Sequence, residues 1–373
     1  MTGVLEKVVV GLSGGVDSAV AAYLLKEAGY DVIGVTLRTW QADDGSESRC
    51  CDIDDAREIS NKLGIRYVPV NCTQAFQKNV VEPFTEVYLR GLTPNPCIEC
   101  NRYVKWDKLL YFAKVLGADK IATGHYANII KLDNGRYTVK TAKYADKDQT
   151  YMLYKLTQPQ LEATLMPLGN LSKSEVRRIA KDAGLPVASK PDSQEVCFIT
   201  DGSYADYIDK NAPPEYKREG DFVDMSGTVL GRHKGIIHYT VGQRKGLGIA
   251  LGHPAYVKEI RADKNEVVIG DDRSLYSTEI RCGDIHFMSV AEMSKGEKFK
   301  CTVKIRYHHK GQTATVEIKE NGIARIVFDE PVRAAAPGQS AVFYAPEGYV
   351  IGGGIITRDV AENEIYTDQG YYA

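Results

Sequence analysis

Residues 11–18, Gly-Leu-Ser-Gly-Gly-Val-Asp-Ser, form the stretch of this chain with the clearest chemical potential. They follow an apolar run at 8–10 and precede a helix-like stretch at 19–28, so a buried strand, a glycine turn and a helix start come in succession. Such a turn brings backbone N–H groups close to an anion, and the helix dipole favours negative charge there. No Gly-Lys-Ser/Thr follows, so this is not the lysine-bearing phosphate loop. We predict a phosphate site rather than an ordinary corner capped by Ser18.

Thiols form the second group of candidates. The chain carries eight cysteines, at positions 50, 51, 72, 97, 100, 197, 282 and 301. In a chain of 373 residues without a secretion signal we expect catalytic or metal-binding thiols rather than a disulfide framework. Cys97 and Cys100 form a Cys-x-x-Cys pair, stiffened by prolines at 94 and 96 and followed by a helix-like stretch at 105–116. A thiolate is favoured near a helix start, so the pair could serve redox chemistry, a metal or a sulfur relay.

Cys197 is a weaker candidate on composition alone. It lies between Val196 and Phe198 at the end of a polar segment, and a lone cysteine among apolar residues is more often a small buried hydrophobe. No second Cys-x-x-Cys pair occurs, so a four-cysteine zinc site is not supported. Three cysteines with an exogenous ligand could instead hold an iron–sulfur cluster.

Alternating strand and helix patterns position these residues. The predicted strands are short apolar runs at 8–10, 32–37, 67–70 and 120–123, and the predicted helices between them lie at 54–63, 80–90 and 105–116. This alternation predicts a parallel sheet with helices on both faces. Ligands of such sheets bind at the carboxyl ends of the strands, which is where the 11–18 loop falls.

Near residue 201 the pattern changes. A short helix at 204–210 and a proline-containing linker at 212–215 lead into glycine-punctuated strands at 227–230, 236–241, 256–260 and 267–269. Further strands at 301–307, 313–318, 324–328 and 340–344 predict a small antiparallel barrel. We therefore expect an α/β protein of three domains: a doubly wound parallel sheet at 1–203, a small mixed central domain at 204–275 and a β-barrel at 276–373.

Composition is that of an ordinary globular protein, 43% hydrophobic and 26% charged. No apolar run approaches the roughly 20 residues of a membrane helix, and the N-terminus enters a strand without a targeting segment, so we expect no membrane partner and a cytoplasmic location. The net charge of −2 means that any nucleic-acid surface must be local. Two basic stretches could provide it, at 232–245 and at 295–310.

Ordered motifs along nearly the whole chain resemble those of the tRNA-specific 2-thiouridylases, which convert the wobble uridine of certain tRNAs to 2-thiouridine. The loop at 11–18 resembles the PP-loop of ATP pyrophosphatases, which cut ATP between the α and β phosphates. The other motifs are Thr93-Pro94-Asn95-Pro96 with Cys100-Asn101, Thr123-Gly124-His125-Tyr126-Ala127, Lys147-Asp148-Gln149-Thr150-Tyr151, Lys190-x-Asp192-Ser193 with Cys197-Phe198-Ile199, residues 242–248, Arg306-Tyr307 and Pro337-Gly338-Gln339.

The resemblance implies that ATP, with Mg²⁺, is bound by the loop together with Leu37 and Gly124. The loop residues are Gly11, Leu12, Ser13, Gly14, Gly15, Val16, Asp17 and Ser18. AMP would pass to the C2 oxygen of the uridine. Cys197 would carry a persulfide delivered by a sulfur-carrier protein or a cysteine desulfurase, and Cys100 would attack as sulfur leaves, with a Cys100–Cys197 disulfide resulting.

The resemblance also implies two sets of tRNA contacts. The target base would meet Asn95, Pro96 and Cys97. The rest of the anticodon region would meet His125, Lys147, Asp148, Gln149, Arg306, Tyr307 and Gln339. Unpaired anticodon-loop bases can be flipped into a pocket, as chemistry on a base requires.

Two alternatives stay open at this point. Many relatives carry Asp where this chain has Cys97, and a third thiol there makes Cys97, Cys100 and Cys197 possible ligands of a [4Fe-4S] cluster with sulfide on its free iron. In a different class, the chain could be a PP-loop ligase or amidating enzyme acting on a small substrate. Such an enzyme would need neither Cys100 and Cys197 nor a basic barrel.

Overall fold

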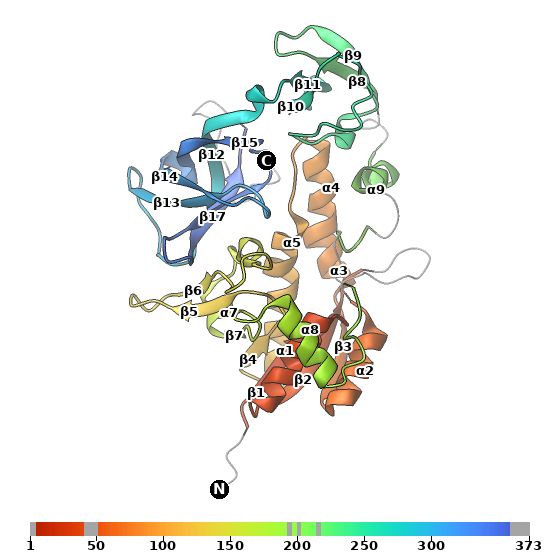
Figure 1. Ribbon diagram of the computed structural model, residues 1–373, viewed down its shortest axis with the longest axis vertical. Helices are drawn as coiled ribbons and strands as arrows, with labels where there is room; N and C mark the ends of the chain where they lie inside the picture. The colour runs from red at the N-terminus through yellow and green to blue at the C-terminus, as the bar shows by residue number, and fades with distance from the viewer. Residues whose placement is uncertain (1–4, 41–50, 192–195, 200–202, 214–217, 359–373) are drawn as a thin grey trace.

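The structure is a computed structural model and describes residues 5–40, 51–191, 196–199, 203–213 and 218–358. Its first part is a sheet of five parallel strands in the order β3-β2-β1-β4-β7, at the bottom of Figure 1. The strands are β1 (Lys7–Gly11), β2 (Asp31–Arg38), β3 (Arg66–Asn71), β4 (Lys120–Ala122) and β7 (Thr164–Leu165). The parallel sheet predicted from the alternating pattern is confirmed.

Helices cover both faces of this sheet because its central strand is apolar on both sides. The helices are α1 (Val16–Glu27), α2 (Ile53–Leu63), α6 (Asp107–Val115) and α8 (Lys173–Asp182). Val8 and Val10 pack in one hydrophobic cluster with α1, α2 and α8, whereas Val9 packs in another with α6. Alternate residues of a strand point to opposite faces, so β1 alone joins both layers of core.

Between β3 and β4 the chain leaves the sheet as a run of helical segments. They are α3 (Thr73–Phe76), η1 (Gln77–Val81), α4 (Glu82–Leu89), α5 (Pro96–Glu99) and η2 (Cys100–Trp106). Both η1 and η2 are π-helical and continue directly into α4 and α6, so the predicted helices at 80–90 and 105–116 begin earlier than their apolar spacing indicated. In Figure 1, α4 rises from the sheet toward the small domain at the top.

A hairpin and two short helical elements lie between the sheet and the barrel. They are β5 (Asn128–Lys131), β6 (Tyr137–Lys140), η3 (Thr150–Leu153) and α7 (Gln158–Glu162). Farther along the chain, α9 (Tyr204–Asn211) packs beside α4. The hairpin contacts the barrel directly, because Thr138 Oγ1 donates to Val350 O at 2.6 Å. The sequence did not predict this hairpin.

The central sheet is mixed, in the order β10-β11-β8-β9, with β11 and β8 parallel. Its strands are β8 (Gly220–Val223), β9 (Val229–His233), β10 (Tyr256–Arg261) and β11 (Glu266–Gly270). The strand predicted at 236–241 is wrong: a 3₁₀ turn, η5 (Ile236–His238), begins there. Gly235 at φ 128° redirects the chain, and the consecutive residues Ile236 and Ile237 are both buried, which a strand with one exposed face would not allow.

Six antiparallel strands close into the C-terminal barrel in the order β12-β15-β14-β13-β16-β17. They are β12 (Tyr276–Phe287), β13 (Lys298–Lys304), β14 (Gln312–Ile318), β15 (Ala324–Arg333), β16 (Ser340–Tyr344) and β17 (Val350–Ile356). The predicted barrel is confirmed, although β12 and the glycine-containing β17 were not expected. The domain boundaries at 203 and 275 stay a prediction. None of the helices in the described ranges is long and apolar enough to cross a membrane.

Candidate active site

The turn between β1 and α1 is organised by its own hydroxyls. Ser18 Oγ accepts a hydrogen bond from Ser13 N at 3.1 Å and donates one to Gly15 O at 3.0 Å. Gly15 is the N-cap of α1 and contributes no side-chain cap, so the first-turn N–H groups of α1 keep their capacity to bind an anion. Gly14 has φ +75°, and a Cβ there would lie 2.6 Å from Asp52 Cβ. Glycine is therefore required at 14 by both conformation and space.

The other two predicted nucleotide residues lie at the ends of the neighbouring strands. Leu37 is buried near the end of β2, which pairs with β1. Gly124 follows β4 on the other side, and a Cβ there would lie 2.6 Å from Ser18 N. The structure thus brings the 11–18 loop and Gly124 together at the carboxyl edge of the parallel sheet, with Leu37 on the adjacent strand.

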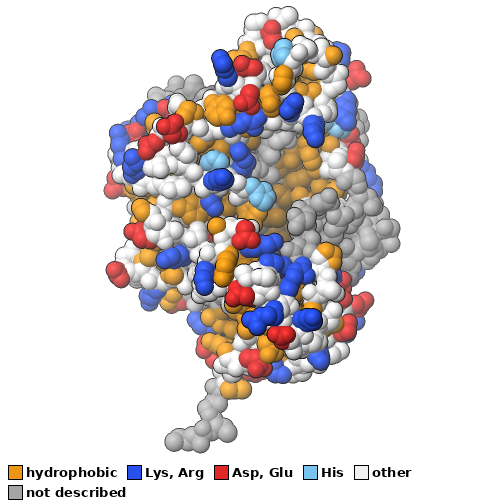
Figure 2. Space-filling model, viewed as in Figure 1, with side chains coloured by type: hydrophobic (Ala, Val, Ile, Leu, Met, Phe, Trp, Pro, Cys, Tyr) orange, Lys and Arg blue, Asp and Glu red, His pale blue; other side chains and the backbone are white. Residues whose placement is uncertain are grey.

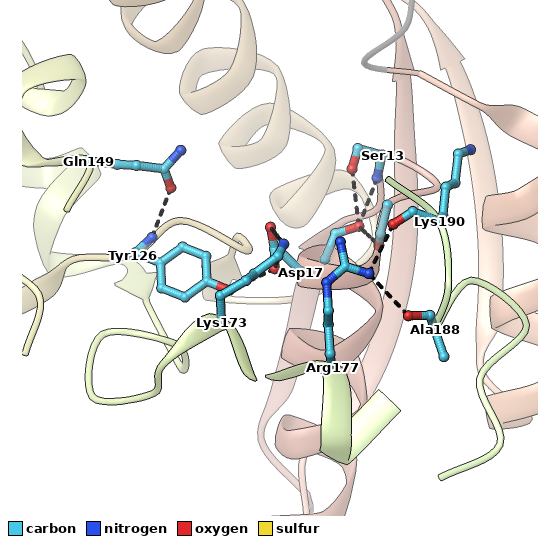
Figure 3. Close-up of polar contacts among 10 residues, drawn as sticks. Ser13, Asp17, Tyr126, Gln149, Lys173, Arg177, Ala188 and Lys190 are labelled. Carbon is cyan, nitrogen blue, oxygen red and sulfur yellow. Dashed lines mark hydrogen bonds and ion pairs between the residues drawn. The ribbon is translucent and has the colours of Figure 1, made fainter. Parts of the chain in front are cut away.

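Lys173 is a candidate that sequence reasoning missed. Its Nζ lies 2.7 and 2.8 Å from the two carboxylate oxygens of Asp17, and Tyr126 Oη donates to Asp17 Oδ1 at 2.7 Å (Figure 3). The Lys173 and Asp17 side chains are 13% and 32% exposed, so the ion pair is partly shielded. A capping box of Ser172 and Glu175 marks the start of α8 and thereby places Lys173 in its first turn. The separation of 156 residues from Asp17 hides the contact from any local pattern.

A second lysine lies on the other side of the loop. Lys190 Nζ pairs with Asp52, the N-cap of α2, at 2.8 Å and with Asp55 in its first turn. Burial raises the pKa of Asp52, but hydrogen bonds from Lys190 and from the Asp55 N–H outweigh burial and hold that pKa below its usual range. Arg177 donates to Lys190 O and Ala188 O at 3.1 and 3.2 Å, which fixes the approach of this segment (Figure 3). The motif residues Asp192 and Ser193 lie outside the described residues.

The three candidate thiols differ in environment. Cys97 is exposed, Cys100 is buried and Cys197 is half-buried. Cys100 and Cys197 both pack against one hydrophobic cluster, which also contains Leu37. The seven described cysteines are thiols, so the implied Cys100–Cys197 disulfide is not formed here. Within the described ranges, no group of three or more His, Cys, Asp or Glu side chains is placed to hold a metal ion.

The cysteine turn, which we define as residues 93–101, is held from both ends. Asn95 caps α5 by accepting a hydrogen bond from Cys97 N at 3.2 Å, and Asn101 Nδ2 donates to Met152 O at 2.9 Å. At its N-terminal end the turn contacts the barrel domain, where Gln339 Nε2 donates to Thr93 O at 3.1 Å and to Pro94 O at 3.3 Å.

On the other side, one buried lysine joins the turn to the barrel. Lys155, 3% exposed, lies 2.9 Å from Glu99 of α5 and 2.8 Å from Asp284 of β12. The register of β12 against β17 shifts between Gly283 and His286, and Asp284 has φ +48°. A bulge of this kind re-aims a side chain, and here the Asp284 carboxylate meets Lys155.

Several predicted tRNA contacts already have partners inside the protein. Asp148 is buried and accepts hydrogen bonds from Ala142 N and Thr150 Oγ1. Gln149 Oε1 accepts one from Tyr126 N at 2.9 Å. Burial, reinforced by nearby Lys105, lowers the pKa of His125 to about 3, so this imidazole is neutral at physiological pH and offers no positive charge to a phosphate.

On the barrel, the predicted Arg306-Tyr307 pair lies close to the cysteine turn. Burial raises the pKa of Tyr307, and the proximity of Asp148 and Cys97 raises it further. Arg306 donates to Arg333 O at 2.9 Å. The half-buried Lys147 and Pro96, the first residue of α5, complete the predicted set. Figure 2 shows Lys and Arg side chains gathered over the centre and lower part of this face, with Asp and Glu side chains among them.

Comparison with known proteins covers the whole length. Family models match in succession: the tRNA methyl transferase HUP domain at 6–201, the tRNA methyl transferase PRC-barrel domain at 206–271 and the aminomethyltransferase beta-barrel domain at 277–356. The tRNA-specific 2-thiouridylase MnmA of Lachnoclostridium phytofermentans is 51% identical over 361 residues, 95% of this chain and 100% of that protein. The protein of the same name from Acetivibrio thermocellus is 51% identical over 94% of this chain and 99% of its own length.

A solved structure resembles this chain more distantly. The U34-tRNA thiolase NcsA from Methanococcus maripaludis, with its [4Fe-4S] cluster, covers 56% of this chain and 67% of its own at 23% identity, with a TM-score of 0.35. A likeness at that level transfers nothing about the cysteines. The half-identical relatives, matched from end to end, decide the assignment: the chain belongs to the family of tRNA-specific 2-thiouridylases.

Proposed function

We propose that this enzyme makes 2-thiouridine in two steps, with the nucleotide loop serving the first and the cysteine turn serving the second. The observation that supports the proposal is that Cys100 lies in, and Cys197 packs against, the hydrophobic cluster that also contains Leu37 of β2, the strand that pairs with β1 beside the 11–18 loop. The small-substrate ligase alternative is disfavoured by the family, and it offers no role for these two thiols.

In the first step the C2 oxygen of the wobble uridine attacks the α phosphate of ATP, and the N3 proton of the base is released to solvent and taken back when 2-thiouridine leaves. The bond between the α and β phosphates breaks, AMP becomes attached to the C2 oxygen, and pyrophosphate leaves. The N–H groups at the start of α1 would bind the phosphates, and Lys173 would turn from Asp17 to neutralise charge that develops on the leaving pyrophosphate. The loop carries no lysine of its own, so a cation supplied by α8 fills that role.

Mg²⁺ is expected with ATP, and the donors beside the loop fit it. Asp52 and Asp55 of α2 flank Gly14, and a Cβ at position 14 would meet the Cβ atoms of both. Carboxylate oxygens are ligands that Mg²⁺ prefers, and Mg²⁺ commonly takes one or two of them together with substrate phosphates. These two residues pair with Lys190 in this structure, so they would hold the ion once Lys190 has moved away, and the ion supplies charge neutralisation when bound.

In the second step a persulfide on Cys197 supplies the sulfur. Its terminal sulfur attacks C2 and AMP leaves, which joins Cys197 to the uridine through a disulfide-like S–S bond. The Cys100 thiolate then attacks the Cys197 sulfur, so that the S–S bond breaks, 2-thiouridine departs with the outer sulfur, and a Cys100–Cys197 disulfide forms. An external thiol reductant restores both thiols. A sulfur-carrier protein or cysteine desulfurase in a cytoplasmic setting would recharge Cys197.

The cluster alternative fits the residues poorly. Cys97 is exposed whereas Cys100 is buried, and the three cysteines are not gathered as a ligand set in the described structure. Cys97 instead lies near Tyr307 of the barrel, at the predicted position of the target base. We therefore propose that Cys97 lines the base pocket and takes no part in the transfer of sulfur.

Serine substitutions of the three cysteines test the proposal. Serine is nearly isosteric with cysteine but is a far weaker nucleophile and iron ligand. Cys197→Ser and Cys100→Ser should both still release AMP when tRNA is present, yet form no 2-thiouridine. Cys97→Ser should retain most thiolation and serves as the matched control. Equal loss in all three variants, together with iron in the anaerobically purified protein, would replace the persulfide route by the cluster route.

A further inference from the structure

Tyr126 joins two parts of the enzyme that the first step must keep coordinated. Its hydroxyl donates to Asp17 Oδ1 at 2.7 Å, within the nucleotide loop. Its backbone is held by Gln149 in a reciprocal pair: Tyr126 N donates to Gln149 Oε1 at 2.9 Å, and Gln149 N donates to Tyr126 O at 3.0 Å. The residue is 3% exposed. Figure 3 shows Tyr126 between Gln149 and Asp17, with Lys173 beside the same carboxylate.

Asp17 accepts hydrogen bonds from two donors of different kinds. Lys173 contacts both carboxylate oxygens with a positive charge, whereas Tyr126 contacts one with a neutral hydroxyl. The phosphates of ATP compete with Asp17 for Lys173. When Lys173 turns to the phosphates, a carboxylate that is only 32% exposed loses its cation, and a partly buried charge with fewer partners is unfavourable. The Tyr126 hydroxyl lowers that cost because it stays on Asp17 in both arrangements.

Gln149 connects Tyr126 to the barrel through its neighbour in the chain. Asp148 is fixed by Ala142 N and Thr150 Oγ1, and Lys304 of β13 lies 3.6 Å from Asp148 Oδ2. The segment 148–149 therefore contacts the barrel on one side and Tyr126 on the other. The barrel is thus connected to the nucleotide loop by the Lys304–Asp148 ion pair, the Gln149–Tyr126 hydrogen bonds and the Tyr126–Asp17 hydrogen bond.

We propose that Tyr126 is a positioning residue that couples tRNA engagement at 148–149 to the transfer of Lys173 from Asp17 to ATP. The proposal rests on the proposed roles of the loop and Lys173. With Gln149 in place, the Tyr126 backbone is fixed and its hydroxyl is aimed at Asp17, so Lys173 is available to the phosphates. The segment 148–149 is already held by Ala142, Thr150 and Tyr126, so tRNA bound against it would favour this existing arrangement, and ATP would be cleaved in the presence of its acceptor.

Tyr126→Phe tests this directly because it removes one oxygen and leaves the ring. Without the hydroxyl, Asp17 retains Lys173 more strongly, so the KM for ATP should rise about tenfold, the scale of one hydrogen bond to a charged group. The ratio of AMP formed with tRNA to AMP formed without tRNA should fall toward one. Tyr111→Phe, at a tyrosine that is 61% exposed on α6, is the matched control and should change neither quantity.

Variants of Gln149 provide a second test of the proposed role of Tyr126. Gln149→Leu removes the acceptor of the Tyr126 N–H and should raise the KM for ATP although Gln149 makes no contact with the loop itself. Gln149→Glu keeps an acceptor oxygen and should lie closer to the wild type in ATP KM. In the Tyr126→Phe/Gln149→Leu double variant the two effects should not add, because both variants break one connection.

The outcomes distinguish failure of the role proposed for Tyr126 from failure of the ATP-binding role proposed for the loop and Lys173. Lys173→Met should raise the KM for ATP if the loop and Lys173 bind ATP. A raised KM in Lys173→Met, with wild-type KM and wild-type tRNA stimulation in Tyr126→Phe, would overturn the role of Tyr126 alone. Wild-type values in both variants would overturn the assignment of Lys173 as well.

Discussion

The nucleotide loop and the cysteine turn are built in opposite ways. In the loop, Ser13, Gly15 and Ser18 satisfy one another within a few residues of sequence. The cysteine turn has one local contact of this kind, the Asn95 cap of α5. Its remaining supports come from Met152, Lys155, Asp284 and Gln339, far along the chain.

This difference teaches where each site is vulnerable. A loop that is fixed by its own glycines and hydroxyls fails through changes inside the motif. A turn that is clamped between the sheet domain and the barrel fails through changes elsewhere in the molecule. Apart from Tyr126 and Lys173, which contact Asp17, the nucleotide loop is therefore expected to tolerate distant substitutions better than the cysteine turn does.

The largest effect is expected from removing the lysine beneath the cysteine turn. Lys155→Met leaves Glu99 and Asp284 without their shared cation, and breaking a buried ion pair costs about 3 kcal/mol or more of the free energy of unfolding. Urea denaturation measures this. Lys319→Met is the control: Lys319, 43% exposed, pairs with Glu317 on the barrel surface, and its loss should cost less than about 0.5 kcal/mol. Equal costs would mean that the turn does not depend on Lys155.

Gly14→Ala breaks the loop from within. The new Cβ would meet Asp52 Cβ at 2.6 Å in a backbone with φ +75°, so we expect a loss of about 2 kcal/mol and of tRNA-dependent AMP release. Gly29→Ala is a matched control, because Gly29 has φ +90° but nothing within 4 Å of its Cβ position. That variant should lose about 1 kcal/mol and still release AMP. If Gly14→Ala retained AMP release, the loop would not be the nucleotide site.

Gln339→Met should have a smaller effect on the turn. It removes the two hydrogen bonds to Thr93 O and Pro94 O at similar side-chain volume, for a cost of about 1 kcal/mol. We expect faster alkylation of the buried Cys100 by iodoacetamide at an unchanged KM for ATP. Unchanged alkylation would show that the barrel contact does not restrain the cysteine turn.

The smallest effect is a pH dependence at His125, beside the nucleotide loop. Its pKa is lowered from 6.5 to about 3 by burial and then by Lys105. Between these values the unfolded chain binds the proton and the folded one does not, so stability falls as pH falls below 6.5. The wild type should lose about 1 kcal/mol more than His125→Gln between pH 7.5 and pH 5.5. Parallel profiles in urea denaturation would contradict this.

The same contrast explains what the sequence could predict. The parallel sheet, its loop and the barrel follow from local periodicity and glycine placement, and they were predicted. Lys173 and Lys155 were not predicted, because each acts through partners that only the folded chain brings near. The π-helical turns after Phe76 and Glu99 also escaped prediction, since apolar spacing locates a helix but does not report one extra residue in a turn.

The clamp on the cysteine turn also sets an order of assembly during synthesis. The parallel sheet gains its fifth strand once residue 165 has emerged, and Lys173 follows shortly afterwards. The turn at 93–101 must wait for Asp284 and then for Gln339, near the end of the chain. A nascent or truncated chain would therefore form the proposed nucleotide site well before the cysteine turn is held in place, and Cys100 would be least protected from oxidation during that interval.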